Sequence, residues 1–151
     1  MKINEIAASM VSKGKGILAA DESTGTMTKR LSGVKVESNE KNRLTFRHAL
    51  FTSKNINKYI SGVILYDETI RQNKNGKTIG EILSKQNILP GIKVDKGAKK
   101  LVGRYESVTE GLDGLRERLE EYYKLGARFA KWRGVYNIGS EFPSQNCIVA
   151  N

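Results

Sequence analysis

The chain alternates segments that have a helical spacing of apolar residues with short segments that are largely apolar. Over residues 3–13 the apolar side chains recur at the spacing of one helix face, and this pattern predicts a helix that ends at Gly14. The stripe consists of Ile3, Ile6, Ala7, Met10 and Val11.

Four short apolar segments come next, with helical patterns between them. The first, residues 17–20, is too short for a helix and is apolar at every position, which is typical of a strand buried on both faces. Residues 60–66, 91–95 and 127–132 are similar. Because parallel strands need crossovers of about a dozen residues or more, this alternation predicts an α/β fold with a parallel sheet.

Three helices are predicted between these strands. Ser38 is the expected N-cap of the first, and a shorter helix is expected around residues 79–83. The third is expected to run from Leu112 to Leu125 and to stop at Gly126. The expected inward-facing residues are Leu44, Phe46, Leu50 and Phe51 in the first helix, and Leu112, Leu115, Leu119 and Tyr122 in the third.

The last residues predict one further helix, with Pro143 at its first position. Eight residues follow Pro143, so we expect this helix to break off within its second or third turn. Residues 96–105 contain four basic side chains and two glycines and are expected to form a basic loop.

Composition places the chain among soluble globular domains, with 38% hydrophobic and 28% charged residues. No run reaches the roughly 18 apolar residues of a membrane span, and Glu5 stands where a secretory signal would be apolar. The single cysteine, Cys147, suits a reducing compartment. We therefore expect a cytoplasmic protein without membrane contact.

Charged residues stand at the carboxyl end of each predicted strand: Asp21 and Glu22 after the first, Asp67 and Glu68 after the second, Lys93 and Asp95 on the third, and Lys131 and Arg133 at the fourth. The carboxyl ends of parallel strands meet at one face of the sheet, where ligand sites are built. With a net charge of +10, this predicts a cationic pocket for a phosphorylated small molecule. Nearby cations also lower a lysine pKa and favour nucleophilic chemistry, although structural ion pairs remain an equally simple explanation.

Other local patterns predict no site. The sequence Gly76-Lys77-Thr78 lacks the earlier glycine of a phosphate-binding P-loop and is expected to form a turn before a short helix. His48 is the single histidine and has no partner at metal-ligand spacing, so we expect no metal site. Cys147 has no base beside it in the sequence.

Four longer motifs resemble class I fructose-1,6-bisphosphate aldolase, in the same order: GKGILAADEST, SGVILYDET, GIKVDKG and GLDGLRERLEEYYKLGARFAKWR. The resemblance implies a TIM (β/α)8 barrel, of which residues 1–151 would form the N-terminal half. That half would contain an N-terminal helix, three βα units, strand four and the start of helix four. A complete barrel takes about 250 residues.

The resemblance also implies roles for individual residues. Asp21 matches the aspartate that assists proton transfer and carbon–carbon cleavage. Lys131 matches a lysine that contacts the substrate and assists the carbinolamine steps of the reaction. The residues that match phosphate-binding positions are Ser23, Thr26, Arg30, Arg43, Lys93 and Arg133. The family often has serine at position 26.

The resemblance implies as well what this chain does not supply. The family's Schiff-base lysine, its acidic pair and its second phosphate-binding loop lie on later strands, so we expect the chain alone not to cleave fructose 1,6-bisphosphate. No cofactor is implied, and a single histidine cannot build the zinc site of a class II aldolase. The alternative is a non-catalytic aldolase-like module that binds phosphates or polyanions. Expected partners are a sugar phosphate, a second copy or a C-terminal half, and an acidic protein surface.

Overall fold

A parallel sheet of four strands forms the centre of the molecule. The computed structural model describes residues 1–101 and 105–151. The strands are β1 (Gly16–Ala20), β2 (Ile60–Leu65), β5 (Leu89–Lys93) and β8 (Phe129–Lys131), in the order β1-β2-β5-β8. The four predicted strands are confirmed, and β1 and β8 lie at the two edges of the sheet.

One face of this sheet packs against helices and forms the core. Val63 and Leu65 on β2 and Ile92 on β5 are at most 1% exposed, because they meet apolar side chains of the surrounding helices. Phe51, Ile70, Ile79 and Leu83 are the fully buried helical residues of this core. Burial of such side chains contributes about 1.5–3 kcal/mol each, so the helical layer fixes the positions of the strands.

The opposite face of the sheet carries the strand residues that lie between the core positions, because successive side chains of a strand point to opposite faces. On this face the Phe129 ring lies across Gly91 and Gly62: a β-carbon added at Gly91 would come within 2.2 Å of the ring, and one at Gly62 within 3.0 Å. Ile17 on the same face is 39% exposed. Lys93 on β5 pairs in register with Lys131 on β8, so both lysines come to the carboxyl edge of this face.

The predicted helices are present with shifted ends. They are α1 (Ile3–Met10), α3 (Glu40–Phe51), α6 (Ile79–Ser84), α7 (Leu115–Lys124) and α8 (Gln145–Ala150). Asn39 rather than Ser38 caps α3, because its side chain accepts a hydrogen bond from the Asn42 amide. Leu112 is 71% exposed and precedes α7, and α8 begins at Gln145 with Ser144 as its N-cap, so Pro143 is not at its first position.

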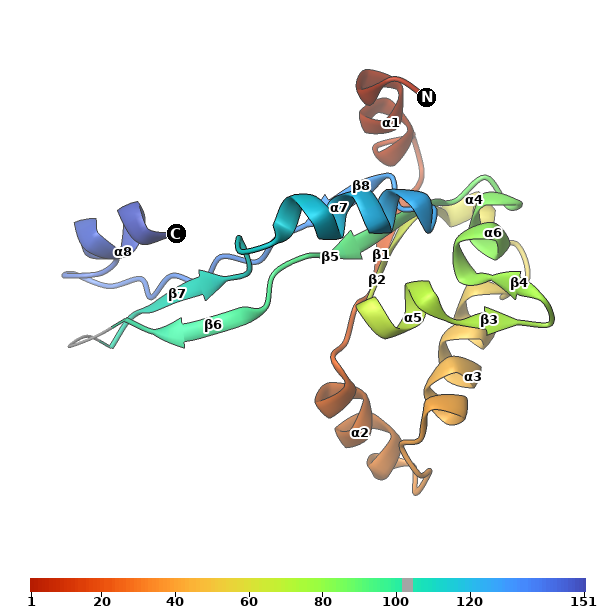
Figure 1. Ribbon diagram of the computed structural model, residues 1–151, viewed down its shortest axis with the longest axis horizontal. Coiled ribbons are helices and arrows are strands. Elements are labelled where there is room, and N and C mark those ends of the chain that lie inside the picture. The colour runs from red at the N-terminus through yellow and green to blue at the C-terminus, as the bar shows by residue number, and fades with distance from the viewer. Residues whose placement is uncertain (102–104) are drawn as a thin grey trace.

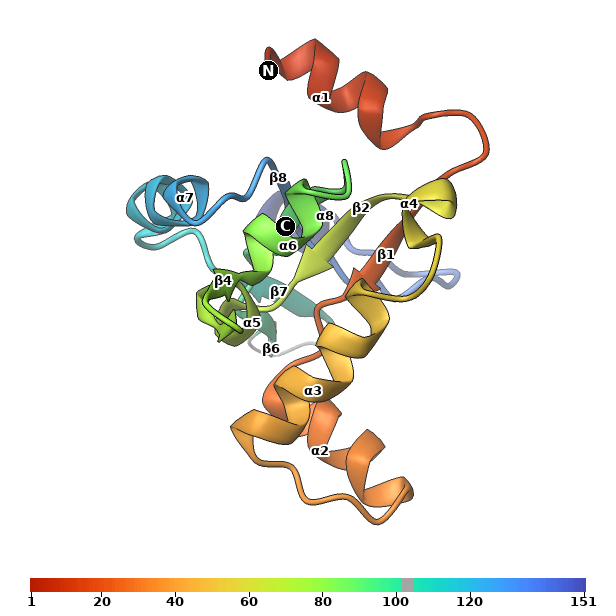
Figure 2. The ribbon, with the colours of Figure 1, turned by 90° about the vertical axis from the view of Figure 1, so that its right-hand side faces the viewer.

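The structure adds helices that the apolar pattern did not indicate. They are α2 (Thr24–Gly33), α4 (Ile56–Tyr59) and α5 (Asp67–Arg71). The helices α2 and α3 lie below the carboxyl end of the sheet, and α1 stands apart at the other end (Figure 2). Because α2 directly follows β1, the first turn of α2 is placed beside the end of that strand.

Two antiparallel hairpins leave the parallel sheet. The first joins β3 (Asn73–Lys74) to β4 (Lys77–Thr78), and Thr78 then caps α6. The expected turn before a short helix is confirmed at Gly76, whereas Lys77 and Thr78 form a strand rather than part of the turn. The second joins β6 (Gly97–Lys100) to β7 (Ser107–Glu110) and extends away from the sheet (Figure 1). The prediction of a basic loop over residues 96–105 is therefore wrong for 97–100, while residues 102–104 lie outside the described residues.

Candidate functional site

A cavity of about 470 Å³ opens at the carboxyl end of the sheet, and we call it the strand-end cavity. Its lining includes seven of the eight residues predicted for the site: Asp21, Ser23, Thr26, Arg30, Lys93, Lys131 and Arg133. They converge because β1, β5 and β8 run in parallel and end at one edge. The lining cations outnumber the carboxylates of Asp21, Glu22 and Asp95, so the cavity favours an anion.

The closest charged contact in this cavity joins the two edges of the sheet. The Lys131 Nζ donates to Asp21 Oδ2 at 2.7 Å, and the side chains are 29% and 14% exposed. This is a charge-assisted hydrogen bond between an amine and a carboxylate that both remain accessible to a small molecule. The pair can therefore deliver or accept a proton at a bound substrate.

Lys93 approaches the same cavity from the middle of the sheet. Its Nζ lies 4.0 Å from Asp95 Oδ1, and the Asp95 side chain is only 3% exposed. This contact is longer than a hydrogen bond, so the Lys93 ammonium keeps its donors for a ligand.

Hydroxyl groups and an arginine line the side of the cavity that α2 provides. The Ser23 Oγ accepts a hydrogen bond from the Thr26 amide and lies 3.2 Å from Thr26 Oγ1, so Ser23 is the N-cap of α2. Arg30, one turn further on, pairs with Glu22 at 2.8 Å. Backbone N–H groups and the dipole at a helix N-terminus favour an anion at this place.

Arg43 is the predicted site residue that the structure does not bring to the cavity. Its guanidinium binds the Glu68 carboxylate through Nε and Nη2, with a shortest distance of 2.5 Å, and also donates to the Ser38 carbonyl. The pKa of Arg43 is raised, and the hydrogen bond to Glu68 is the largest cause. Arg43 thus connects α3 to α5.

The sequence analysis missed Arg47, one turn along α3 from Arg43. Arg47 is fully buried, and it donates to the Glu22 carbonyl at 2.5 Å and approaches Glu68 at 3.4 Å. Burial lowers the pKa of Arg47, although the charges of Glu22 and Glu68 oppose this effect. Because the Glu22 carbonyl directly follows Asp21 in the chain, Arg47 fixes the backbone at the edge of the cavity. The available signal was the spacing of Arg43 and Arg47, which places two cations on one helix face.

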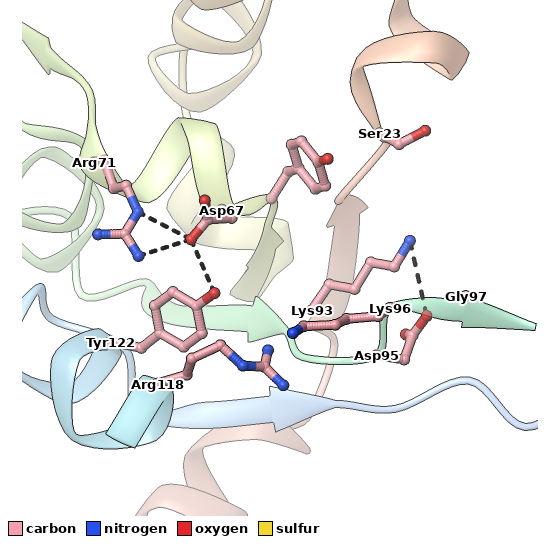
Figure 3. A pocket seen from close by; sticks show the side chains of 10 residues that line it. Ser23, Asp67, Arg71, Lys93, Asp95, Lys96, Gly97, Arg118 and Tyr122 are labelled. Atoms are coloured by element: carbon pink, nitrogen blue, oxygen red, sulfur yellow. Dashed lines mark hydrogen bonds and ion pairs between the residues drawn. The ribbon is translucent and has the colours of Figure 1, made fainter. Parts of the chain in front are cut away.

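A second cavity, of about 630 Å³, lies beside the first, and we call it the Tyr122 cavity (Figure 3). Asp67 accepts hydrogen bonds there from the Tyr122 hydroxyl and the Arg71 Nε, both at 2.9 Å. Burial acts to raise the pKa of Asp67, but the hydrogen bonds from Arg71 and Tyr122 outweigh it and the pKa is lowered. The two cavities share Ser23, Lys93, Asp95 and Gly97 in their linings.

Acid is expected to destabilise the chain through Asp67 and Glu68. Hydrogen bonds from Arg43 are the largest cause that lowers the pKa of Glu68, and the pKa of Asp67 is lowered as well. The unfolded chain therefore binds protons at a higher pH than the folded chain does. The stabilisation is present above the ordinary pKa values of 3.8 and 4.5 and is lost as the pH falls through the lowered values.

Urea midpoints measured across this acidic range test that expectation. The midpoint should fall steadily as the pH drops below about 4.5, and an Asp67→Asn, Glu68→Gln double variant should show a weaker dependence. An equal slope in both proteins would contradict the assignment.

Among the described residues, no group of three or more His, Cys, Asp or Glu side chains is placed to hold a metal ion. Cationic and hydroxyl side chains make up most of the polar lining of the strand-end cavity, which is the donor set for an anionic ligand rather than for a metal.

Comparisons with known proteins identify the family. The family model for class I fructose-bisphosphate aldolase matches residues 2–151. The chain belongs to the class I fructose-bisphosphate aldolase family. A probable fructose-bisphosphate aldolase class 1 from Xanthomonas campestris is 57% identical over 99% of this chain, and a cytoplasmic isozyme from Pisum sativum is 54% identical over 91% of it.

A solved aldolase structure has the same fold. The fructose-bisphosphate aldolase from Plasmodium falciparum, in a complex with TRAP and a small-molecule inhibitor, matches 98% of this chain with a TM-score of 0.93 and 46% identity. The predicted fold is thereby confirmed: the four parallel strands are strands one to four of the aldolase TIM barrel. The chain spans 46% of the length of the Xanthomonas relative and 44% of the Plasmodium chain.

In residues 1–101 and 105–151, no helix is long and apolar enough to cross a membrane.

Proposed function

We propose that this aldolase chain takes part in the cleavage of fructose 1,6-bisphosphate to dihydroxyacetone phosphate and glyceraldehyde 3-phosphate, and that the strand-end cavity binds one phosphate of the sugar. The observation that carries the proposal is the convergence of Asp21, Lys93 and Lys131 on one cationic cavity. Family membership supports the reaction, and the geometry supports the place of the substrate.

Asp21 and Lys131 are the proposed catalytic residues. Their 2.7 Å contact holds a carboxylate and an ammonium together at the carboxyl end of the barrel strands, where a substrate hydroxyl or carbonyl can reach both. In the proposed role Asp21 moves the proton that accompanies carbon–carbon cleavage, and Lys131 donates to the substrate oxygen.

The proposed phosphate-binding residues are Ser23, Thr26, Arg30, Lys93 and Arg133, all of which line the cavity. The hydroxyls and the N-terminus of α2 offer neutral donors, and the three cations supply charge. For Arg43 we propose a different role from phosphate binding, because Glu68 and Ser38 occupy its guanidinium.

Titration calorimetry with fructose 1,6-bisphosphate tests the phosphate site. Replacing Arg30 with methionine removes a cation from the cavity lining, so we expect at least about tenfold weaker binding, the usual size for a charge-assisted contact. Arg116→Met on α7 is the matched control, since Arg116 is exposed and does not line the cavity, and its affinity should be unchanged. Equal affinities of all three proteins would contradict the proposal.

The 151-residue chain is expected to bind the sugar bisphosphate without cleaving it, because the family resemblance places the imine-forming lysine on a later strand. A coupled assay for triose phosphates on the same samples checks this expectation. Steady cleavage would show that a lysine of this chain, such as Lys131, can form the imine.

Partners and location are proposed on the same basis. We propose that the free edges of β1 and β8 pair with a second copy or with a complementary C-terminal half, since unpaired strand edges tend to recruit other strands. A cytoplasmic location is supported by the cytoplasmic isozyme from Pisum sativum. An acidic protein surface is a further proposed partner because the net charge is +10.

The alternative function is a non-catalytic module that binds phosphates or polyanions. The same net charge favours it. It predicts that a polyanion such as heparin displaces the sugar bisphosphate and that Arg30→Met and Arg116→Met weaken binding alike, because such binding follows the overall charge.

A further inference from the structure

The Tyr122 cavity contains more positive charge than its own carboxylates neutralise. Four cationic side chains line it, namely Arg71, Lys93, Lys96 and Arg118, against the carboxylates of Asp67 and Asp95. Asp67 and Glu121 pair with Arg71, and Asp95 lies 4.0 Å from Lys93. Within residues 1–101 and 105–151, Lys96 and Arg118 have no carboxylate at ion-pair distance.

Neutral groups hold Arg118 in place. Its Nη1 donates to the Val94 carbonyl at 3.0 Å, and its Nη2 donates to the Gly111 carbonyl at 2.5 Å. These contacts join α7 to the segments after β5 and after β7, so the guanidinium is already ordered before any ligand binds. Ordered cations bind an anion with a smaller loss of conformational entropy than mobile ones.

Lys96 approaches from the opposite side. Its backbone amide donates to the Glu110 carbonyl at 2.8 Å, which anchors the residue at the base of the β6–β7 hairpin. Figure 3 shows its side chain extending toward Arg118 and Tyr122, while Lys93 points toward Ser23. Lys96 lines the Tyr122 cavity alone, whereas Lys93 lines both cavities.

The size and the walls of the cavity fit a small organic anion. Its volume of about 630 Å³ lies within the usual range for small-molecule sites. Tyr66 and Tyr122 contribute aromatic rings to the lining, which suit the apolar part of a ligand. A phosphate group between Lys96 and Arg118 would compensate both charges.

We propose that the Tyr122 cavity is a second anion-binding site, which takes a phosphate monoester between Lys96 and Arg118. This site goes beyond the proposed function, because no residue proposed for catalysis depends on it. Lys93 and Asp95 separate the two cavities, so anions bound on both sides repel each other across this shared wall. Binding at one site therefore weakens binding at the other, and the effect is reciprocal.

Amide NMR titration with inorganic phosphate tests the proposal in the 151-residue chain, because it reports each cavity separately. We expect shifts at Lys96, Arg118 and Tyr122 from the Tyr122 cavity, and at Thr26 and Arg30 from the strand-end cavity. Replacing Lys96 with methionine should lower the phosphate affinity that the first set reports at least tenfold. The shifts at Thr26 and Arg30 should persist, with an affinity that is equal or higher because the competing anion is gone. Lys99→Met is the matched control, since Lys99 is an exposed lysine on the same hairpin and does not line the cavity.

Arg30→Met separates this inference from the proposed function. Loss of the shifts at Thr26 and Arg30 with retention of those at Lys96, Arg118 and Tyr122 would support the inference. Shifts confined to Lys96, Arg118 and Tyr122 in the unmodified chain would support it too, but they would contradict the phosphate role of the strand-end cavity. Shifts confined to Thr26 and Arg30 would overturn the inference and leave the proposed function intact. The inference would also be overturned if phosphate shifted both sets of amides with one affinity that Lys96→Met and Arg30→Met lower equally. A titration without any shifts would overturn it as well.

Discussion

Replacing Glu68 with glutamine is expected to lower the free energy of unfolding by about 3–5 kcal/mol, the usual cost of removing one partner from a buried ion pair. Glu68 lies between Arg43 and Arg47, and Arg47 is fully buried. The amide of glutamine keeps one acceptor for Arg43 but carries no charge. Two neighbouring guanidinium groups would then repel each other in a site with little water.

Urea unfolding of purified variants measures this effect. Glu121→Gln is the matched control, because Glu121 pairs with Arg71 at the surface, where both side chains are well exposed. Such a pair contributes less than about 1 kcal/mol. Adding Arg47→Met to Glu68→Gln should restore part of the lost stability, since an apolar side chain then fills the buried position. If Glu68→Gln lowered the free energy of unfolding no more than Glu121→Gln does, the ion pairs of Glu68 with Arg43 and Arg47 would not be effectively buried.

Replacing Gly80 with alanine is expected to cost about 3 kcal/mol, near the upper end for overpacking. A β-carbon at Gly80 would lie 2.6 Å from the backbone carbonyl oxygen of Leu125. This oxygen belongs to the C-terminal end of α7, and backbone cannot rotate away as a side chain can. The helices α6 and α7 would therefore have to move apart, which would open the core around Tyr122 and Leu83.

Thermal unfolding of Gly80→Ala and Gly33→Ala measures the effect against a control. Gly33 lies at the end of α2, and no atom lies within 4 Å of a β-carbon built there. Alanine at this position should be neutral or slightly stabilising, by up to about 1 kcal/mol, because it restricts the unfolded chain. Similar melting temperatures for the two variants would show that α6 and α7 can separate at little cost.

The sheet could be predicted from sequence because its strands are short and largely apolar. Charged residues stand at the carboxyl end of each of the four segments and so mark where the strands end. Asp21, Lys93 and Lys131 could be grouped for the same reason, since the ends of parallel strands converge whatever the details of the helices. The 2.7 Å contact of Asp21 with Lys131 also depends on the curvature of the sheet, which a linear pattern does not contain.

The helices were less predictable because their buried faces are not apolar. In α3 the buried residues are Arg43, Arg47 and Phe51, whereas Phe46 and Leu50 are each 37% exposed. An apolar stripe therefore identifies only part of the buried face of this helix, because it includes the buried Phe51 but also the part-exposed Phe46 and Leu50. The assignment of Arg43 to phosphate came from the family resemblance, which does not reveal the pairing of Arg43 with Glu68. In α2 the buried residues are only Met27 and Leu31, so the stripe is too narrow to detect.

The β6–β7 hairpin escaped prediction for a related reason. Its first strand, Gly97–Lys100, is mostly exposed and contains two lysines, so neither alternation nor burial marks it as a strand. Its pairing with Ser107–Glu110 and the contacts of α8 with β7 stabilise it instead. Tertiary partners of this kind decide the conformation of segments whose intrinsic preference is weak.

The contact between Asp21 and Lys131 joins residues 110 positions apart in the chain. During synthesis β1 leaves the ribosome first and can pair with β2, but the Asp21 carboxylate meets the Lys131 ammonium only after the fourth strand has emerged. The Asp21–Lys131 pair therefore forms later than the pairing of β1 with β2, and a nascent chain that stops before β8 lacks the two residues proposed for catalysis.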